Sequence, residues 1–308
     1  MGSYTYGPVA SRRLGRSLGV DLTPAKTCNL NCIYCQLGPT AQPTMERREY
    51  VPVADVVREV RDRLEALSPP DYVTLAGSGE PTLHSCFGQV AGQIGRLTDV
   101  PLALLTNGAL MFMPEVRRAC DSLDLVLPSL DAGDEETFQR INRPHPELSL
   151  ETVVQGLTRL RREFAGQVWL EVLLVEGVNS SDEQVGRIKN CVERIQPHRV
   201  QLNAPVRPPA EEVAVPSWER LEEIRDLLGP RAEIIAPVGD LAASAGTRAE
   251  RAEVLALLRR RPSTVGDVAV GLGIHPNVAV KHLQALLNAG QVRRRQRLYE
   301  TYYEAASD

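Results

Sequence analysis

The chain has 308 residues, 43% of them hydrophobic and 24% charged, which is enough apolar material for a folded core and excludes global disorder. A formal net charge of -4 excludes a uniformly basic nucleic-acid-binding protein, although it allows a local basic patch. No apolar run is long enough to span a membrane, and the first residues lack the apolar stretch of a secretory signal. We therefore expect a cytoplasmic protein whose thiols are reduced.

From residue 18 to residue 236, short aliphatic or β-branched runs alternate with amphipathic helical stretches, a pattern typical of repeated βα units. Strands are predicted at 18–22, 71–76, 101–106, 124–129, 168–175 and 199–204, with a short seventh at 232–236. Between the strands, a helix is predicted over 53–67, and Ser181 with Gln184 predicts the start of another. We expect an α/β fold in which residues 1–236 form a partial (β/α)6 TIM-type barrel. Reactive groups should lie at the carboxyl ends of its strands.

Residues 237–247 are rich in small residues and turn formers, and they predict a linker. Beyond them, apolar spacing predicts three short helices, and the runs QVRRRQ and LYETYY predict two strands joined by a tight turn. Pro276 fits the first turn of the third helix, and Gly290 fits its end. We therefore expect a C-terminal winged helix-turn-helix domain over residues 248–308.

Three of the six cysteines, Cys28, Cys32 and Cys35, lie within eight residues just after the first predicted strand. Soft thiolate ligands suit iron, and a loop can turn each of them inward around an iron-sulfur cluster. Three ligands for a four-iron cluster leave one iron open to a substrate or cofactor. Zinc is the alternative, with His84 or His145 as a distant fourth ligand, but zinc sites usually come as two separated pairs.

The cysteine spacing, with Tyr34 directly before the third cysteine, resembles the radical S-adenosylmethionine (radical SAM) superfamily. The resemblance covers about residues 7–210. It implies that Cys28, Cys32 and Cys35 hold a [4Fe-4S] cluster whose fourth iron binds S-adenosylmethionine. It also implies reductive cleavage of S-adenosylmethionine to a 5'-deoxyadenosyl radical, with a flavodoxin or ferredoxin as electron donor.

The resemblance extends to Tyr34 in the cysteine loop and to residues at or after the ends of the predicted strands, and it implies that they contact S-adenosylmethionine. These residues are Tyr34, Gly79, Glu80, Pro81, Asn107, Ser129, Asp131, Asn179 and Asn203. Glycine at position 79 permits a close approach of the ligand to the backbone, and short polar groups suit a sugar hydroxyl. A plain strand-to-helix turn at residues 77–81 and a capping role for Asp131 are the alternatives.

The runs GPVASRRLGRSLGVDL and LNAPVRPPAE resemble, more narrowly, the iron-sulfur oxidoreductases related to the wyosine-synthase enzymes of tRNA. Those enzymes carry a second cluster on upstream cysteines, whereas this chain has no cysteine before Cys28. Four arginines in these runs, and Arg143 outside them, suit contact with a substrate phosphate or carboxylate, and a solvated surface is the alternative. They are Arg12, Arg13, Arg16, Arg143 and Arg207.

Residues 248–308 carry ten Lys or Arg and six Asp or Glu, a net charge of +4 against -8 for the rest. Four wing arginines are expected to contact phosphates, and the polar side of the third helix is expected to contact bases. The arginines are Arg293, Arg294, Arg295 and Arg297, and the helix positions are Asn277, Lys281, Gln284 and Asn288.

Three functions fit these observations. The first is a radical SAM enzyme that modifies a nucleic acid, with tRNA as the substrate brought by the winged domain. The second is a radical SAM enzyme that modifies a bound peptide or protein. The third is a redox-sensing regulator whose cluster controls DNA binding, which the length of the α/β region disfavours because a sensor needs only a small cluster-binding fold.

Overall fold

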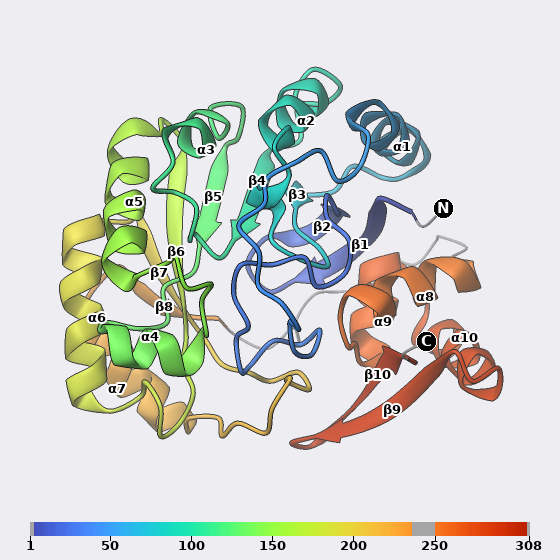
Figure 1. Cartoon of the computed structure of the whole chain (residues 1–308). Helices are drawn as coiled ribbons and strands as arrows, with labels where there is room; N and C mark the ends of the chain where they lie inside the picture. Colours follow the sequence, from blue (N-terminus) through green and yellow to red (C-terminus); the bar gives the residue numbers. More distant parts are fainter. Residues whose placement is uncertain (1–2, 236–249, 307–308) are drawn as a thin grey trace.

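The computed structural model describes residues 3–235 and 250–306, and its centre is one mixed eight-stranded sheet (Figure 1). The strands lie in chain order from one edge to the other, and every neighbouring pair is parallel except the first. They are β1 (Thr5–Ser11), β2 (Gly15–Val20), β3 (Tyr72–Leu75), β4 (Leu102–Thr106), β5 (Leu125–Pro128), β6 (Gln167–Leu173), β7 (Arg199–Asn203) and β8 (Ala232–Ile234). The edge strands β1 and β8 do not pair with each other, so the sheet stays open.

Helices connect the parallel strands in six successive βα units, from β2 with α1 to β7 with α7. They are α1 (Val53–Ala66), α2 (Phe87–Ile94), α3 (Pro114–Arg118), α4 (Glu135–Ile141), α5 (Leu150–Glu163), α6 (Asp182–Ile195) and α7 (Trp218–Leu228), with a 3-10 turn η1 at Pro81–Leu83. Ser181 caps α6 by accepting the N–H of Gln184, as the sequence predicts. The predicted α/β class and the parallel order of the strands are confirmed.

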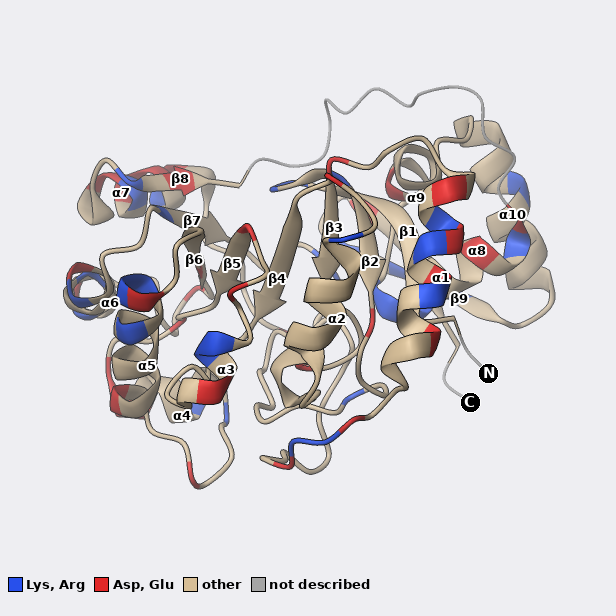
Figure 2. Cartoon of the chain, turned by 90° about the horizontal axis from the view of Figure 1, so that it is seen from above, with Lys and Arg blue, Asp and Glu red and all other residues tan. Residues whose placement is uncertain are grey.

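The core lies between the sheet and the helices that cover its outer side. Strands β3, β4 and β5 contain no charged residue and are tan throughout in Figure 2. A parallel strand covered on both faces must be apolar on both, which explains these nearly continuous hydrophobic runs. Helix α1 faces the core with Val53, Val56, Val57 and Val60.

Strand β1 is the element that the sequence reading missed. Its sequence, TYGPVAS, contains a Gly-Pro pair that reads as a turn rather than as a strand. Proline is tolerated there because β1 is an edge strand of the sheet. The strand runs antiparallel to β2 and places the turn at residues 12–14 directly before β2, the first of the parallel strands.

Residues 250–306, called here the C-terminal segment, form three helices and a two-stranded antiparallel hairpin. The elements are α8 (Arg251–Arg260), α9 (Val265–Leu272), α10 (Pro276–Asn288), β9 (Val292–Arg297) and β10 (Glu300–Ala305). Pro276 occupies the first turn of α10, and Gly290, with φ of 66°, follows its end. The predicted linker at 237–247 lies outside the described residues.

The C-terminal segment packs directly on β1, beside which it lies in Figure 1. Val9 of β1 belongs to the same hydrophobic cluster as Leu257, Val268 and Leu283 of the segment. Gly271 of α9 makes this approach possible, because a Cβ there would lie 2.9 Å from the carbonyl oxygen of Pro8. Among the described residues, no helix is long and apolar enough to cross a membrane.

Candidate active site

The three clustered cysteines lie in the long loop between β2 and α1 and line one cavity of about 370 Å³. Consecutive turns shape this loop, since the N–H of Cys35 bonds to the carbonyl of Cys32 and the N–H of Gly38 to that of Cys35. All three cysteine residues are of intermediate burial and form no disulfide. The loop therefore presents the three sulfur atoms to a shared space.

Each of the three sulfur atoms has a nitrogen donor beside it. Asn107 Nδ2 lies 3.5 Å from Cys28 Sγ, and Asn142 Nδ2 lies 3.4 Å from Cys32 Sγ. Lys26 Nζ lies 3.8 Å from Cys35 Sγ and also donates to the carbonyl of Gly38. Donors of this kind favour the thiolate, which is the form that binds a metal.

Burial acts in the opposite direction on two of the thiols. It raises the pKa of Cys28 to about 12 and raises the pKa of Cys32 well above its usual range. Within residues 3–235 and 250–306, no three Cys, His, Asp or Glu side chains converge on a single ion. A multi-iron cluster does not require such convergence, because each thiolate ligates a different iron.

The loop Gly77–Pro81 after β3 is held against the cysteine loop. Gly79 fits only because it has no side chain, since a Cβ would lie 2.2 Å from the carbonyl oxygen of Thr27. The backbone N–H of Glu80 donates to that same carbonyl over 2.8 Å. Gly79 therefore locks the segment before Cys28 to the end of β3, and Pro81 begins the buried turn η1 that follows.

The Glu80 side chain is buried and accepts four hydrogen bonds from protein groups. The donors are the hydroxyls of Thr82 and Thr106, at 2.6 Å each, and the backbone N–H groups of Thr82 and Asn107. Burial outweighs these donors and raises the pKa of Glu80. The carboxylate thus ties the β3 loop to the end of β4, where Asn107 faces Cys28.

A second buried network lies behind Cys32. Tyr34 donates its hydroxyl to Asp131, which also accepts from Asn142 Nδ2 at 2.8 Å and from the N–H of Leu173 at 2.9 Å. Burial raises the pKa of Asp131 to about 6. Asn179 is fully buried and donates to the carbonyls of Asp131 and Leu173. Asp131 and Asn179 therefore brace the strand ends rather than line the cavity.

The ends of β5 and β7 contribute Ser129 and Asn203 to the cavity wall. Asn203 accepts from Arg12 Nη2 at 2.8 Å and donates to Glu171 Oε1 at 2.6 Å. Glu171 in turn pairs with Arg13 at 2.7 Å. The hydroxyl of Ser129 makes no hydrogen bond to any residue that the structure describes, so it is available to a ligand.

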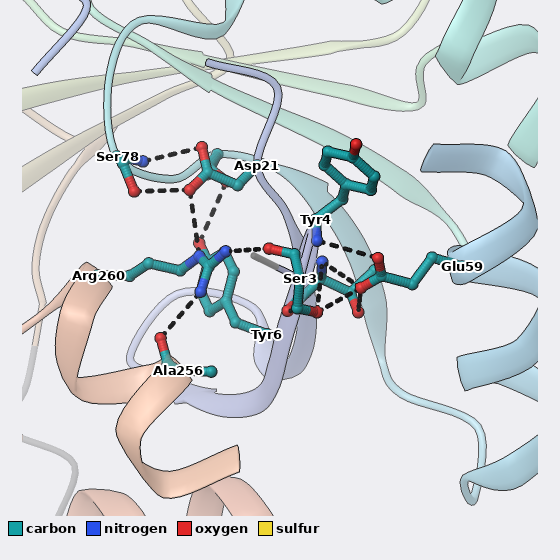
Figure 3. A network of polar contacts seen from close by, with 10 residues as sticks. Ser3, Tyr4, Tyr6, Asp21, Glu59, Ser78, Ala256 and Arg260 are labelled. Carbon is teal, nitrogen blue, oxygen red and sulfur yellow. Dashed lines mark hydrogen bonds and ion pairs between the residues drawn. The ribbon is translucent and has the colours of Figure 1, made fainter. Parts of the chain in front are cut away.

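The C-terminal segment supplies part of the same wall through Arg260 and Arg261. Figure 3 shows Arg260 reaching Asp21, at 3.1 Å, while Asp21 accepts the hydroxyl and N–H of Ser78. The guanidinium also stacks over the Tyr6 ring, with 5.0 Å to its centroid. The β3 loop is thereby connected to helix α8 through one carboxylate.

The cavity brings together most of the residues singled out in the sequence. It is lined by Cys28, Cys32, Cys35, Tyr34, Gly79, Glu80, Asn107, Ser129 and Asn203, together with Arg12, Arg13 and Arg207. Pro81, Asp131 and Asn179 lie outside the lining, as do Arg16 and Arg143, the latter paired with Glu211. The sequence analysis missed three lining residues, Glu171, Arg260 and Arg261. Glu171 could have been found, because it is the one charged residue within the apolar run of β6.

The chain matches the family model of the radical SAM superfamily over residues 22–187. It is 33% identical to a protein named UPF0026 protein from Helicobacter pylori, covering 93% of this chain and 92% of that one. It is 36% identical over 292 residues to a protein named GTPase Obg from Brachyspira hyodysenteriae; these are 94% of this chain but only 43% of that protein. A radical SAM methyltransferase structure from Sphaerobacter thermophilus has a similar fold, with a TM-score of 0.54 and 19% identity over 71% of this chain and 65% of that one.

Proposed function

We propose that this chain, which belongs to the radical SAM superfamily, is an enzyme that uses a [4Fe-4S] cluster and S-adenosylmethionine, and that Cys28, Cys32 and Cys35 hold the cluster. The observation that carries this assignment is the shared cavity into which the three thiols open, each beside a nitrogen donor. When bound, the cluster supplies the electron that cleaves S-adenosylmethionine to methionine and a 5'-deoxyadenosyl radical.

The surrounding residues have two proposed roles. Gly79, Asn107, Ser129 and Asn203 line the cavity and bind S-adenosylmethionine. Glu80, Pro81, Tyr34, Asp131 and Asn179 act mainly by positioning the loops that carry the binding groups, because their contacts are made to protein atoms. The free hydroxyl of Ser129 supports a direct contact with the ligand.

We propose that residues 1–236 form the barrel domain, 237–247 a linker and 248–308 a winged helix-turn-helix domain that brings a nucleic acid, tRNA, to the cavity. Exposed side chains on α10 support this, since Asn277, Lys281, Gln284 and Asn288 all face solvent. The wing is less available than its sequence indicates. Arg295 and Arg297 pair with Glu212 of the loop after β7, and Arg293 pairs with Glu304.

Two further assignments complete the proposal. A flavodoxin or ferredoxin donates the electron, since the reaction requires a one-electron reductant. The enzyme works in the cytoplasm, where thiols remain reduced and available to iron.

Replacement of Cys28, Cys32 and Cys35 together by Ala tests the cluster assignment. After anaerobic reconstitution, the wild-type chain should show iron-sulfur absorbance and a paramagnetic signal on reduction, and the triple variant should show neither. Cys86→Ala is the matched control, because Cys86 is also partly exposed but lies outside the cavity lining. The reduced wild type should release methionine and 5'-deoxyadenosine, separated by chromatography. Full cluster retention in the triple variant would contradict the proposal.

A further inference from the structure

Three arginines from distant parts of the chain meet in the wall of the cavity. Arg12 lies in the turn between β1 and β2, Arg207 in the loop after β7, and Arg261 directly after α8. The side chains of Arg207 and Arg261 are 13% and 12% exposed. The C-terminal segment therefore contributes a buried cation to the cavity that also contains the cysteines.

Two of the three guanidinium groups share a single carboxylate, and the third has none. Asp267 lies 3.6 Å from Arg207 and 3.8 Å from Arg261, and no other carboxylate in the described parts of the chain pairs with either arginine. Arg12 has no ion-pair partner there, and its partner Asn203 is neutral. The neighbouring pairs Arg13 with Glu171 and Arg260 with Asp21 are each balanced. The cluster formed by Arg12, Arg207, Arg261 and Asp267 thus carries two uncompensated positive charges.

The pKa values of Arg12 and Arg261 show that their charged forms are destabilised in this arrangement. Burial, together with the repulsion of Arg207, lowers the pKa of Arg12 to about 10 and that of Arg261 to about 9. Arg261 Nε is buried and has no hydrogen-bond partner among the described residues. Buried charges and buried donors are normally paired, so these groups lack a partner that an anion can supply.

Packing of the C-terminal segment accounts for only part of the cluster. Arg207 donates to the carbonyl of Pro262, and Arg261 donates to the carbonyl of Ala10, so both also join the segment to the barrel. Arg12 makes no contact of that kind, although it is the most weakly compensated of the three. A purely structural role leaves its partly buried, unpaired charge unexplained.

We propose that Arg12, Arg207 and Arg261 bind a phosphate or carboxylate group of the substrate. Guanidinium groups present planar forks of N–H donors that match both oxyanions. The inference rests on the proposed function in one respect. The anion is assigned to the substrate because the same cavity is proposed to hold the cluster and S-adenosylmethionine. The C-terminal segment then completes the substrate pocket as well as covering the edge of the sheet.

Titration of the full-length protein with inorganic phosphate and, separately, with succinate tests the site. Calorimetry at constant ionic strength, with chloride as the reference anion, should detect binding of at least one of the two. Binding of phosphate alone assigns a phosphate-bearing substrate, and binding of succinate alone assigns a carboxylate. Binding of neither, beyond chloride, would overturn the proposal.

Arg12→Gln should weaken binding of the anion at least tenfold, because it removes the positive charge and the guanidinium fork. Arg261→Lys should weaken it less, because the charge remains and only the fork is lost. Arg259→Gln is the matched control, since Arg259 is exposed and makes no ion pair among the described residues. An equal loss in Arg12→Gln and Arg259→Gln would show a nonspecific charge effect and would overturn the proposal.

The affinity of the cluster-loaded protein for S-adenosylmethionine separates this site from the cofactor site. Arg12→Gln should bind S-adenosylmethionine as the wild type does, and a parallel tenfold loss would assign the arginines to the cofactor instead. If the wild type holds no cluster but binds phosphate or succinate through Arg12, the proposed function fails and the anion site stands. If the cluster assembles and neither anion binds, the proposed function stands and the anion site is wrong.

Discussion

Arg260 Nε donates to Asp21 Oδ2 over 3.1 Å, and through this contact the last turn of α8 reaches the loop that follows β3. Asp21 also accepts the hydroxyl of Ser78 at 2.6 Å and its N–H at 3.0 Å. The side chains of Arg260 and Asp21 are 11% and 7% exposed, so the pair is well shielded from water. The Asp21 carboxylate therefore holds both the C-terminal segment and the β3 loop, residues 77–81.

Arg260→Met should lower the free energy of unfolding by about 3–5 kcal/mol, because it leaves the buried Asp21 carboxylate without its cation. Thermal or urea unfolding measures the loss. The double variant Asp21→Asn/Arg260→Met should recover part of it, since the neutral amide no longer needs the guanidinium. Arg259→Met, on an exposed position of the same helix, should change stability by less than about 0.5 kcal/mol. Equal stability of Arg260→Met and Arg259→Met would show that the pair contributes nothing.

Local patterns predicted the strands and the cysteine loop, but they could not predict contacts between distant segments. Asn107 and Ser129 were found because both are polar residues at the ends of predicted strands, where the radical SAM resemblance implies contacts with the cofactor. Arg260 and Arg261 lie over 200 residues from Cys35, and the run of three arginines that ends α8 reads as an ordinary basic helix end. Only the packing of α9 on β1 brings these arginines to the cavity, and β1 itself was hidden by its Gly-Pro pair.

The arginines of β9 illustrate the same limit. Arg293 to Arg297 read as a solvent-facing basic strand, yet two of them turn back to Glu212 and the carbonyl of Val213. Glu212 is itself 79% exposed, so nothing in the local hydropathy marks it as a partner. Pairing across the loop after β7 is a property of the tertiary structure.

Lys26→Met should make the reduction potential of the cluster more negative. The ammonium lies 3.8 Å from Cys35 Sγ, and a positive charge there stabilises the additional negative charge of the reduced cluster. A redox titration followed by the paramagnetic signal measures the shift. Lys281→Met removes the same charge from an exposed site on α10 and should leave the potential unchanged. A potential that is unaltered, or shifted in the positive direction, in Lys26→Met would contradict this reasoning.

Glu59→Gln should destabilise the protein at pH 7 by about 1 kcal/mol, after allowance for partial exposure to solvent. Burial alone would raise the pKa of Glu59, but the donors on Ser3, Tyr4 and Thr5 outweigh it and lower that pKa. A carboxyl with a lowered folded-state pKa stabilises the fold above its unfolded-state value and loses that contribution as pH falls.

The difference between Glu59→Gln and the wild type should therefore disappear as pH falls through the folded-state pKa of Glu59. Urea unfolding at a series of pH values between 3 and 7 measures it. Glu65→Gln, at an exposed position of the same helix, should show little difference at any pH. A destabilisation by Glu59→Gln that persists undiminished at low pH would rule out the carboxylate as its source.

Arg294→Ala should flatten the salt dependence of nucleic-acid binding more than Arg297→Ala. Arg294 is exposed and has no ion pair among the residues described, whereas Arg297 Nη1 lies 3.1 Å from Glu212. Each phosphate contact contributes a log-log slope of about -0.9 on duplex nucleic acid and about -0.7 on a single strand. Titration against tRNA at several salt concentrations measures both slopes. An equal change in the two variants, or binding that does not respond to salt, would argue against contact by Arg294.

Strand β1 is synthesised well before the helices that cover it. Its outer side is covered by helices that are synthesised some 240 residues later. Val9 is therefore not buried until Val268 and Leu283 have been synthesised and packed against it. At about 5–20 residues per second, the ribosome needs on the order of 10–50 s to supply them. During synthesis, the outer side of β1 is thus exposed until helices α8, α9 and α10 emerge. Assembly of the cavity wall is in this way tied to synthesis of the C-terminal segment, so a product truncated before residue 250 lacks the cover of β1 together with Arg260 and Arg261.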